Sequence, residues 1–281
     1  SLILLSKPIE LREFNRKQNK KQKIEINAQV KNLYFKAENI TDKILKKKVV
    51  GWPSPKTQNP RLELEEKHRF GKSNSYKIKN DIVLFSGKKT ISEFIYIPEK
   101  YSVIFEAGTK LYFKNKSGII SHSPVFMNGT KEMPIVISGD STSQGIHVLQ
   151  ASKKSALQWT KFSGLNTLNY KGWTLTGAVT FYESDVAIEH CVFEHNKCED
   201  ALNVIRSNFT FLESLIQYTF ADGLDGDFCI GEIKNSTFKN TNNDCIDFSG
   251  STISISRPAV SSSSMPCGAA YKPFSIAIIC L

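Results

Sequence analysis

Hydrophobic and polar positions repeat along the C-terminal half of the chain with a period of 22 or 23 residues. Four windows of thirteen residues superpose without gaps, and they begin at Thr176, Glu199, Ala221 and Asn243. In the last three windows an aspartate is followed by a small residue, an aliphatic residue and then asparagine or aspartate. A period of this length is typical of stacked supersecondary units.

Each repeat consists of short β-like runs separated by polar turns. The runs are rich in Thr, Ser and Asn and too short for helices. Stacked coils place equivalent residues about 4.8 Å apart, so each strand pairs in parallel with the same strand of the next coil. The aliphatic column Leu202, Leu224 and Ile246 would then fill the interior. The sequence therefore predicts an all-β fold, a parallel β-helix with coils of about 22 residues, and the bias of crossover connections favours the right-handed form.

The pattern divides the chain into three parts. Residues 1–80 alternate only in places, as at Ile24–Val30, and are interpreted as a β-rich segment, either a small sandwich-like domain or the remnant of an upstream one. Residues 81–257 carry the repeat, and the stretch that ends at Leu175 is predicted to loop out as an insertion. Residues 258–281 lose the pattern and are predicted to form an irregular tail, either an atypical cap or unrelated sequence after a truncated stack.

Charge separates the same parts of the chain. The formal net charge is +10, but residues 1–80 carry +12, residues 81–281 carry −2 and residues 188–250 carry −7. A basic segment therefore precedes an acidic solenoid. The lysine runs lack the interleaved aromatic residues of a nucleic-acid site and suit solvated loops and strand edges. No apolar stretch reaches the length of a transmembrane helix, so we expect neither a nucleic-acid partner nor a membrane-spanning segment.

Aspartates recur at two positions of the repeat. The first column holds Asp200, Asp222 and Asp244, and the second holds Asn203, Asp225 and Asp247, with Asp227 two residues beyond Asp225. Carboxylates about 4.8 Å apart on successive coils repel one another unless something compensates. Backbone N–H groups at a strand-entry corner would compensate in a structural role, which we expect for Asp200. A calcium ion bound by Asp225, Asp227 and Asp247 would compensate in a binding role, and paired carboxylates could also catalyse acid–base chemistry on a sugar.

The ligand or cation candidates are therefore Asp222, Asp225, Asp227, Asp244 and Asp247. Other polar residues give weaker signals. Arg206 aligns with Phe228 and Gly250, and it could contact an acidic sugar or serve as an exposed counter-ion. The six cysteines show no metal-ligand spacing, so we interpret them as small buried residues.

Residues 81–255 resemble right-handed parallel β-helix repeat proteins of the pectate-lyase-like superfamily. The first coils of that superfamily are similar to IPEKYSVIFEAGTKLYF, which begins at Ile97, and to NGTKEMPIVISG, which begins at Asn128. Solenoids that accompany CotH-type surface proteins resemble GAVTFYESDVAIEHCVFEHNKCEDALNV and DGLDGDFCIGEIKNSTFKNTNNDCIDFSGS. The resemblance implies a secreted or cell-surface protein whose partner is a carbohydrate or an upstream domain of the same polypeptide. It selects no activity, because the superfamily contains lyases, hydrolases, epimerases, adhesins and stalks.

Three functions remain open at this point. They are a cell-surface module that binds carbohydrate, a cation or a partner through its acidic face, a calcium-dependent polysaccharide lyase, and a structural stalk. The segment Asn240–Asp247 resembles the AsnThrAsp segment of polygalacturonase-like hydrolases, but their GlyHisGly and ArgIleLys partners are absent from the sequence. A lyase needs a positively charged base, which Lys234 or Lys239 would supply only from the same face. The sequence favours the binding module and leaves enzymatic activity undecided.

Overall fold

The computed structural model describes residues 59–68 and 70–257 with their side chains, and the backbone of five short strands beyond them. Contacts divide the chain into two units, Ser1–Thr57 and Gln58–Leu281. In the first unit, β1 (Leu33–Glu38) and β2 (Ile44–Val49) form an antiparallel pair. The predicted strand at Ile24–Val30 lies outside the described residues.

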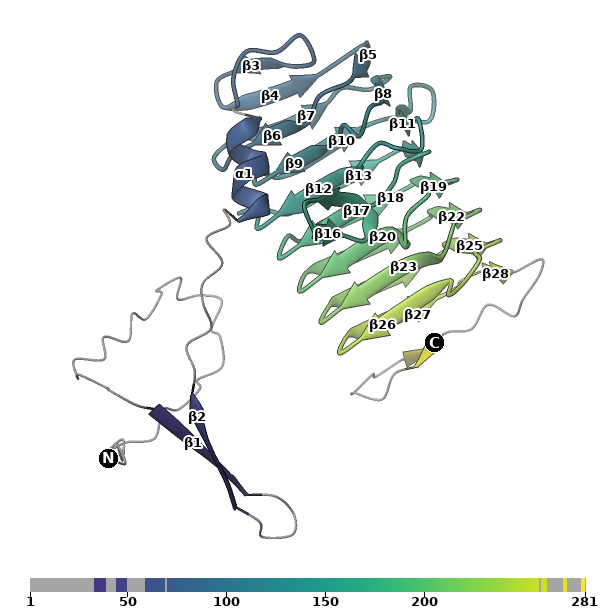
Figure 1. The fold of residues 1–281 in the computed structure, drawn as a ribbon. Coiled ribbons are helices and arrows are strands. Elements are labelled where there is room, and N and C mark those ends of the chain that lie inside the picture. Colours follow the sequence, from purple (N-terminus) through teal and green to yellow (C-terminus); the bar gives the residue numbers. More distant parts are fainter. Residues whose placement is uncertain are drawn as a thin grey trace. The chain divides into compact units, whose positions relative to one another are not determined.

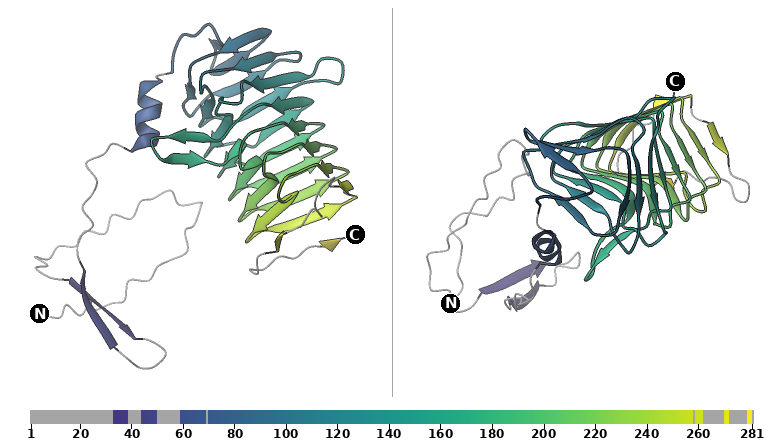
Figure 2. Two further views of the ribbon diagram at one scale, coloured as in Figure 1. Left: turned by 45° about the vertical axis from the view of Figure 1, so that its right-hand side comes forward. Right: turned by 90° about the horizontal axis from the view of Figure 1, so that it is seen from above.

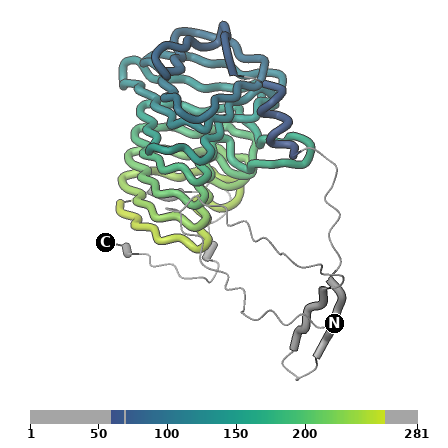
Figure 3. Tube along the Cα trace, turned by 90° about the vertical axis from the view of Figure 1, so that its left-hand side faces the viewer, coloured from purple at the N-terminus to yellow at the C-terminus, as the bar shows by residue number. Residues whose placement is uncertain are grey.

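The second unit is a parallel β-solenoid with coils of about 23 residues, which confirms the predicted fold and nearly the predicted period. Each coil contributes one strand to each of three sheets, and successive coils stack in chain order (Figure 1). The same stacking is visible in the tube of Figure 3, where the colours advance coil by coil. Seen from above in Figure 2, the strands superimpose into long walls.

The first sheet contains, in spatial order, β3 (Lys77–Lys79), β4 (Ile82–Phe85), β7 (Ser102–Phe105), β10 (Val125–Asn128), β13 (Ser155–Gln158), β18 (Val186–Glu189), β21 (Asn208–Leu212), β24 (Ile230–Lys234), β27 (Thr252–Ser256) and β30 (Ile279–Cys280). The second sheet contains β5 (Lys88–Ile91), β8 (Lys110–Phe113), β11 (Ile135–Gly139), β14 (Thr160–Ser163), β19 (Val192–Glu194), β22 (Leu215–Gln217), β25 (Thr237–Lys239) and β28 (Ala259–Ser261). The third sheet contains β6 (Ile95–Ile97), β9 (Ile119–Ser121), β12 (Ile146–Leu149), β17 (Gly177–Tyr182), β20 (Asp200–Ile205), β23 (Asp222–Asp227), β26 (Ile246–Ser249) and β29 (Ala270–Tyr271). All neighbours in these sheets are parallel except β3 and β4, which form an antiparallel pair at the N-terminal end.

The predicted tail at residues 258–281 lies mostly outside the described residues, and three short strands are described within it. Its short strands β28, β29 and β30 pair in parallel with β25, β26 and β27, so they continue all three sheets. Pairing at a sheet edge uses backbone groups alone, and for this reason it does not require the side-chain pattern by which the earlier coils are recognised.

The interior consists of stacked columns of apolar side chains. Leu202 and Leu224 lie opposite each other in adjacent strands and are fully buried, while Ile246 packs against the same core, as the repeat predicted. Phenylalanines stack in the same manner, and the rings of Phe162 and Phe193 lie 4.8 Å apart on successive coils. Burial of these columns is the main source of the solenoid's stability.

The corners between the first and second sheets share a left-handed backbone conformation. His190, Glu213 and their equivalents adopt left-handed conformations with φ near 50°, which is unfavourable for residues other than glycine and asparagine. In the corners at His190, Glu213 and Asn235 the next residue is a buried cysteine or serine. The hydroxyl of Ser214 accepts a hydrogen bond from the backbone N–H of Cys191 at 2.9 Å and donates to the carbonyl of Leu212 at 2.7 Å. These bonds join adjacent coils and offset the strain, and they confirm that Cys191 occupies a serine position.

A helix and a hairpin cover one part of the third sheet. The helix α1 (Pro60–Lys67) begins after Asn59, whose side chain accepts from the N–H of Arg61; the sequence analysis did not predict this helix. The hairpin of β15 (Leu168–Tyr170) and β16 (Trp173–Leu175) is antiparallel and confirms the predicted insertion. Both elements lie side by side in Figures 2 and 3. Leu64 of the helix and Leu168 of the hairpin belong to one apolar cluster with Ile120. None of the helical structure in the described residues has the length and apolar character needed to span a bilayer.

A glycine on one coil leaves room for a phenylalanine ring on the neighbouring coil. Gly231 lies opposite Phe209, and a Cβ at Gly231 would come within 2.4 Å of the Phe209 ring. We expect Gly231→Ala to lower the free energy of unfolding by about 1–3 kcal/mol, because the buried ring must move out of its rotamer. Chemical denaturation of the two proteins measures this difference.

The matched control is Gly71→Ala. An added Cβ at Gly71 meets nothing within 4 Å, so this variant should unfold at the same denaturant concentration as the wild type, within about 0.5 kcal/mol. Equal effects of the two substitutions would contradict the packing argument.

Candidate functional site

One outward-facing column of the third sheet changes character from end to end. Because Leu202 and Leu224 face the core, the next residues along the same strands face outward. In order along the solenoid, the column contains Tyr96, Ile120, His147, Thr180, Asn203, Asp225 and Asp247. The column therefore begins apolar and ends in two carboxylates.

The helix α1 and the hairpin of β15 and β16 cover one part of this column. Leu64 of α1 and Leu168 of the hairpin pack on Ile120 and Leu149. The carboxylate of Glu63 holds the two covering elements together, since it accepts from the hydroxyl of Tyr170 at 3.1 Å and pairs with Lys171. Among the described residues, the apolar side chains of this cluster include none from β20, β23 or β26. The apolar cover thus ends before the late coils, and we call the aspartates of these coils the acidic face.

An asparagine links the two aspartate columns. The side-chain amide nitrogen of Asn203 donates to Asp200 at 3.0 Å and to Asp225 at 2.8 Å. Asn203 and Asp200 are each only 2% exposed. Burial raises the pKa of Asp200 to about 6. Burial, together with the charges of Asp200, Asp227 and other nearby aspartates, raises the pKa of Asp225 to about 8, so Asp225 holds a proton at neutral pH.

A second group lies one coil further on. Asp222, Asp244 and Asp247 each place a carboxylate oxygen within 4.8 Å of the other two. Asp222 is fixed at its position, because one of its oxygens accepts from the amide of Asn243 at 2.6 Å and from the backbone N–H of Asp244 at 2.9 Å. This group shares only Asp247 with the trio that the sequence suggested for calcium.

Unpartnered polar atoms concentrate in the same outward column. Among the described residues, five buried side-chain atoms have no hydrogen-bond partner. Four of them belong to this column, and they are His147 Nδ1, Thr180 Oγ1, Asn203 Oδ1 and Asp247 Oδ1. Buried polar atoms in proteins are nearly always satisfied by protein, water or a ligand. The column is therefore a place where water or a bound group must supply the missing contacts.

The remaining predicted residues lie at the edge of the acidic face. Asp227 ends β23, opposite Ser249 of β26. Arg206 occupies the adjoining corner, where its guanidinium lies 3.6 Å from Glu183 and 5.9 Å from the centre of the Phe228 ring. These contacts show how Arg206 is held and leave its suggested contact with an acidic sugar untested.

Several side chains that shape the site were not predicted from the sequence. Phe220 and Phe228 flank β23 and are 60% and 61% exposed, but a single aromatic residue in a turn carries no signal in the repeat. Asn243 was also missed, because its contact with Asp222 becomes visible only when successive coils are stacked. Comparisons of this chain with models of protein families, with curated proteins and with solved structures found no match.

The raised pKa of Asp225 predicts a pH-dependent stability. In the unfolded chain this carboxyl ionises near 3.8, and in the folded protein near 8, so the folded state binds the extra proton between these values. Stability contributed by the protonated group is complete at low pH and is lost as the pH rises toward 8, by at most about 1.4 kcal/mol per pH unit. Denaturation in the presence of EDTA at a series of pH values measures this slope.

Asp225→Asn should flatten that profile and raise the stability near pH 8, since the amide needs no proton. The matched control is Glu232→Gln, which removes one carboxylate from the exposed face of the first sheet. Parallel profiles for the wild type and Asp225→Asn would contradict the assignment.

Proposed function

We propose that this protein is a secreted or cell-surface β-solenoid module that binds calcium at its acidic face and uses that face to bind carbohydrate or a partner. The observation that carries the proposal is the group formed by Asp222, Asp244 and Asp247, in which one oxygen of Asp247 is buried without a partner. A cation would satisfy that oxygen and cancel the repulsion between the carboxylates.

The geometry suits a hard cation that prefers oxygen. Calcium binds oxygens at about 2.3–2.6 Å, so two of its ligands lie at most about 5 Å apart. The three carboxylate oxygens, all within 4.8 Å of one another, meet this condition before any side chain moves. Calcium accepts irregular surroundings and completes its shell with water, whereas magnesium demands a near-ideal octahedron. A cluster that contains only carboxylates also disfavours zinc, which prefers nitrogen and sulfur ligands.

The flanking aromatic rings support a carbohydrate as the second ligand. Phe220 and Phe228 stand at the two ends of β23, which contains six residues and so spans about 20 Å. Exposed rings on both sides of polar groups are the arrangement by which proteins stack on sugar rings and hydrogen-bond their hydroxyls. The resemblance to pectate-lyase-like and CotH-associated solenoids supports the same ligand class and an extracellular location, where weak calcium sites are filled.

Binding is favoured over lyase chemistry by the positions of the cations. Lys234 belongs to the first sheet and Lys239 to the second, so neither strand forms part of the acidic face. Arg206 is already paired with Glu183. A structural stalk is the other alternative, and it would require no ligand at the unpartnered oxygen of Asp247.

Calcium titration of the whole chain by calorimetry tests the proposal. We expect saturable binding that Asp247→Asn weakens by about tenfold or more, because a lost ligand costs at least as much as a lost outer-shell partner. Glu232→Gln, which removes an equal charge outside the acidic face, should bind as the wild type does.

Two further variants separate the alternatives. Asp225→Asn should retain binding if Asp222, Asp244 and Asp247 form the site, and the double variant Asp225→Asn/Asp247→Asn should lose it. Absence of calcium binding by the wild type, with stability unchanged or improved in both variants, would overturn the proposal in favour of the stalk.

A further inference from the structure

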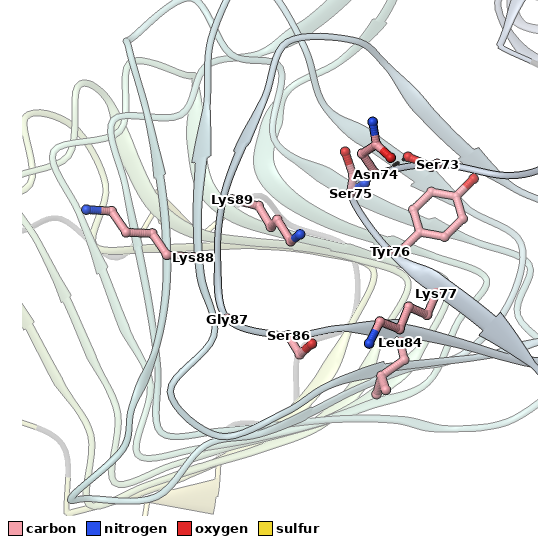
Figure 4. Close-up of a pocket in the computed structure, with 10 residues that line it drawn as sticks. All are labelled: Ser73, Asn74, Ser75, Tyr76, Lys77, Leu84, Ser86, Gly87, Lys88 and Lys89. Atoms are coloured by element: carbon pink, nitrogen blue, oxygen red, sulfur yellow. Dashed lines mark hydrogen bonds between the residues drawn. The ribbon is translucent and has the colours of Figure 1, made fainter.

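A hollow of about 470 Å³ lies at the N-terminal end of the solenoid, far along the chain from the acidic face. Its walls come from the segment Ser73–Lys77, from Leu84 of β4, and from Ser86–Lys89, where the chain turns from the first sheet into the second (Figure 4). We call it the lysine pocket. Its volume lies within the range of about 300–1,000 Å³ that is usual for small-molecule sites.

Two ammonium groups enter the lysine pocket from opposite walls. In Figure 4 the side chain of Lys89 points across the hollow toward the segment Ser73–Lys77, that of Lys77 points back toward Ser86, and that of Lys88 points away from both. Elsewhere on the solenoid, Lys161 and Lys171 are paired with glutamates.

The lysines of the pocket have no carboxylate partner among the residues that the structure describes. Within the described part of the chain, no acidic side chain forms an ion pair with Lys77, Lys88 or Lys89. The surrounding residues 70–116 carry a net charge of +5. Unpaired cations that converge on a hollow raise the local concentration of anions.

The rest of the lining can recognise hydroxyl groups. Ser75, Ser86 and Asn74 line the hollow with side chains that both donate and accept hydrogen bonds. The backbone turns at Gly87 with φ +69°, and even an added Cβ there would meet nothing within 4 Å, so the opening is not blocked from this side. The ring of Tyr76 forms an apolar wall, and its hydroxyl is already used on the carbonyl of Gly71.

We propose that the lysine pocket binds a small hydroxylated anion, a sugar phosphate or a sugar acid. The two ammonium groups would hold the phosphate or carboxylate, and the serine and asparagine side chains would bind hydroxyls. This site is independent of the acidic face, which has the opposite charge and prefers cations.

Calorimetric titration of the whole chain with glucose 6-phosphate, glucuronate, inorganic phosphate and glucose tests the proposal. We expect at least one of the two charged sugars to bind more tightly than inorganic phosphate, glucose not to bind, and salt to weaken the interaction. The two charged sugars distinguish a phosphate from a carboxylate as the recognised group. The double variant Lys77→Gln/Lys89→Gln should weaken binding by about tenfold or more.

The matched control is Lys153→Gln/Lys154→Gln, which removes the same charge from an exposed loop outside the pocket. It should bind as the wild type does. Equal losses in both double variants would show a general charge effect and overturn the proposal, as would equal binding of glucose.

Self-association is the competing explanation of an unpaired basic end, because residues 188–250 of a second copy carry a net charge of −7. Sedimentation at several concentrations tests it. Association that Lys77→Gln/Lys89→Gln abolishes, without binding of any small anion to the wild type, would overturn the proposal in favour of an interface between copies. Binding of a small anion in the lysine pocket does not depend on a calcium result at the acidic face.

Discussion

The structure depends on backbone hydrogen bonds between equivalent strands of successive coils. Each strand of the solenoid finds its partner one coil later, in parallel and in register. Such pairing fixes the distance between equivalent side chains at about 4.8 Å, whatever those side chains are. Every position of the repeat thus becomes a column, and each column must contain residues that tolerate their own neighbours.

Apolar columns satisfy this requirement easily, and polar columns satisfy it in different ways. Leucines and phenylalanines stack in the interior and gain from the contact. Serines in the corners form ladders in which each hydroxyl serves two coils. Where a phenylalanine is too large for its column, the neighbouring coil carries glycine, as at Phe209 and Gly231. In each case the pairing of coils places equivalent side chains next to one another, and the residue types at those positions make that contact favourable.

In the aspartate columns this favourable contact is incomplete among the residues that the structure describes. Asn203 separates Asp200 from Asp225, and protonation of Asp225 removes one charge. Asp247 nevertheless keeps a buried oxygen without a partner. The apolar cover formed by α1 and the hairpin includes no residue of these coils. A buried oxygen that no protein group satisfies, next to a surface that α1 and the hairpin do not cover, is the physical basis for placing a ligand there.

The sequence by itself determined the repeat, the parallel stacking, the interior column at Leu202 and Leu224, and the membership of both aspartate columns. These features are local in sequence, since a fixed period of 22 residues specifies which residues become neighbours. Tertiary structure alone decided which carboxylates approach one another, because Asp244 lies in a corner whose position depends on the turn before β26. It also decided which part of the third sheet is covered, since α1 and the hairpin are separated by about a hundred residues in the chain and carry no repeat. The lysine pocket likewise forms between the antiparallel strand β3 and the first coil, and a periodic pattern does not predict the structure at its own end.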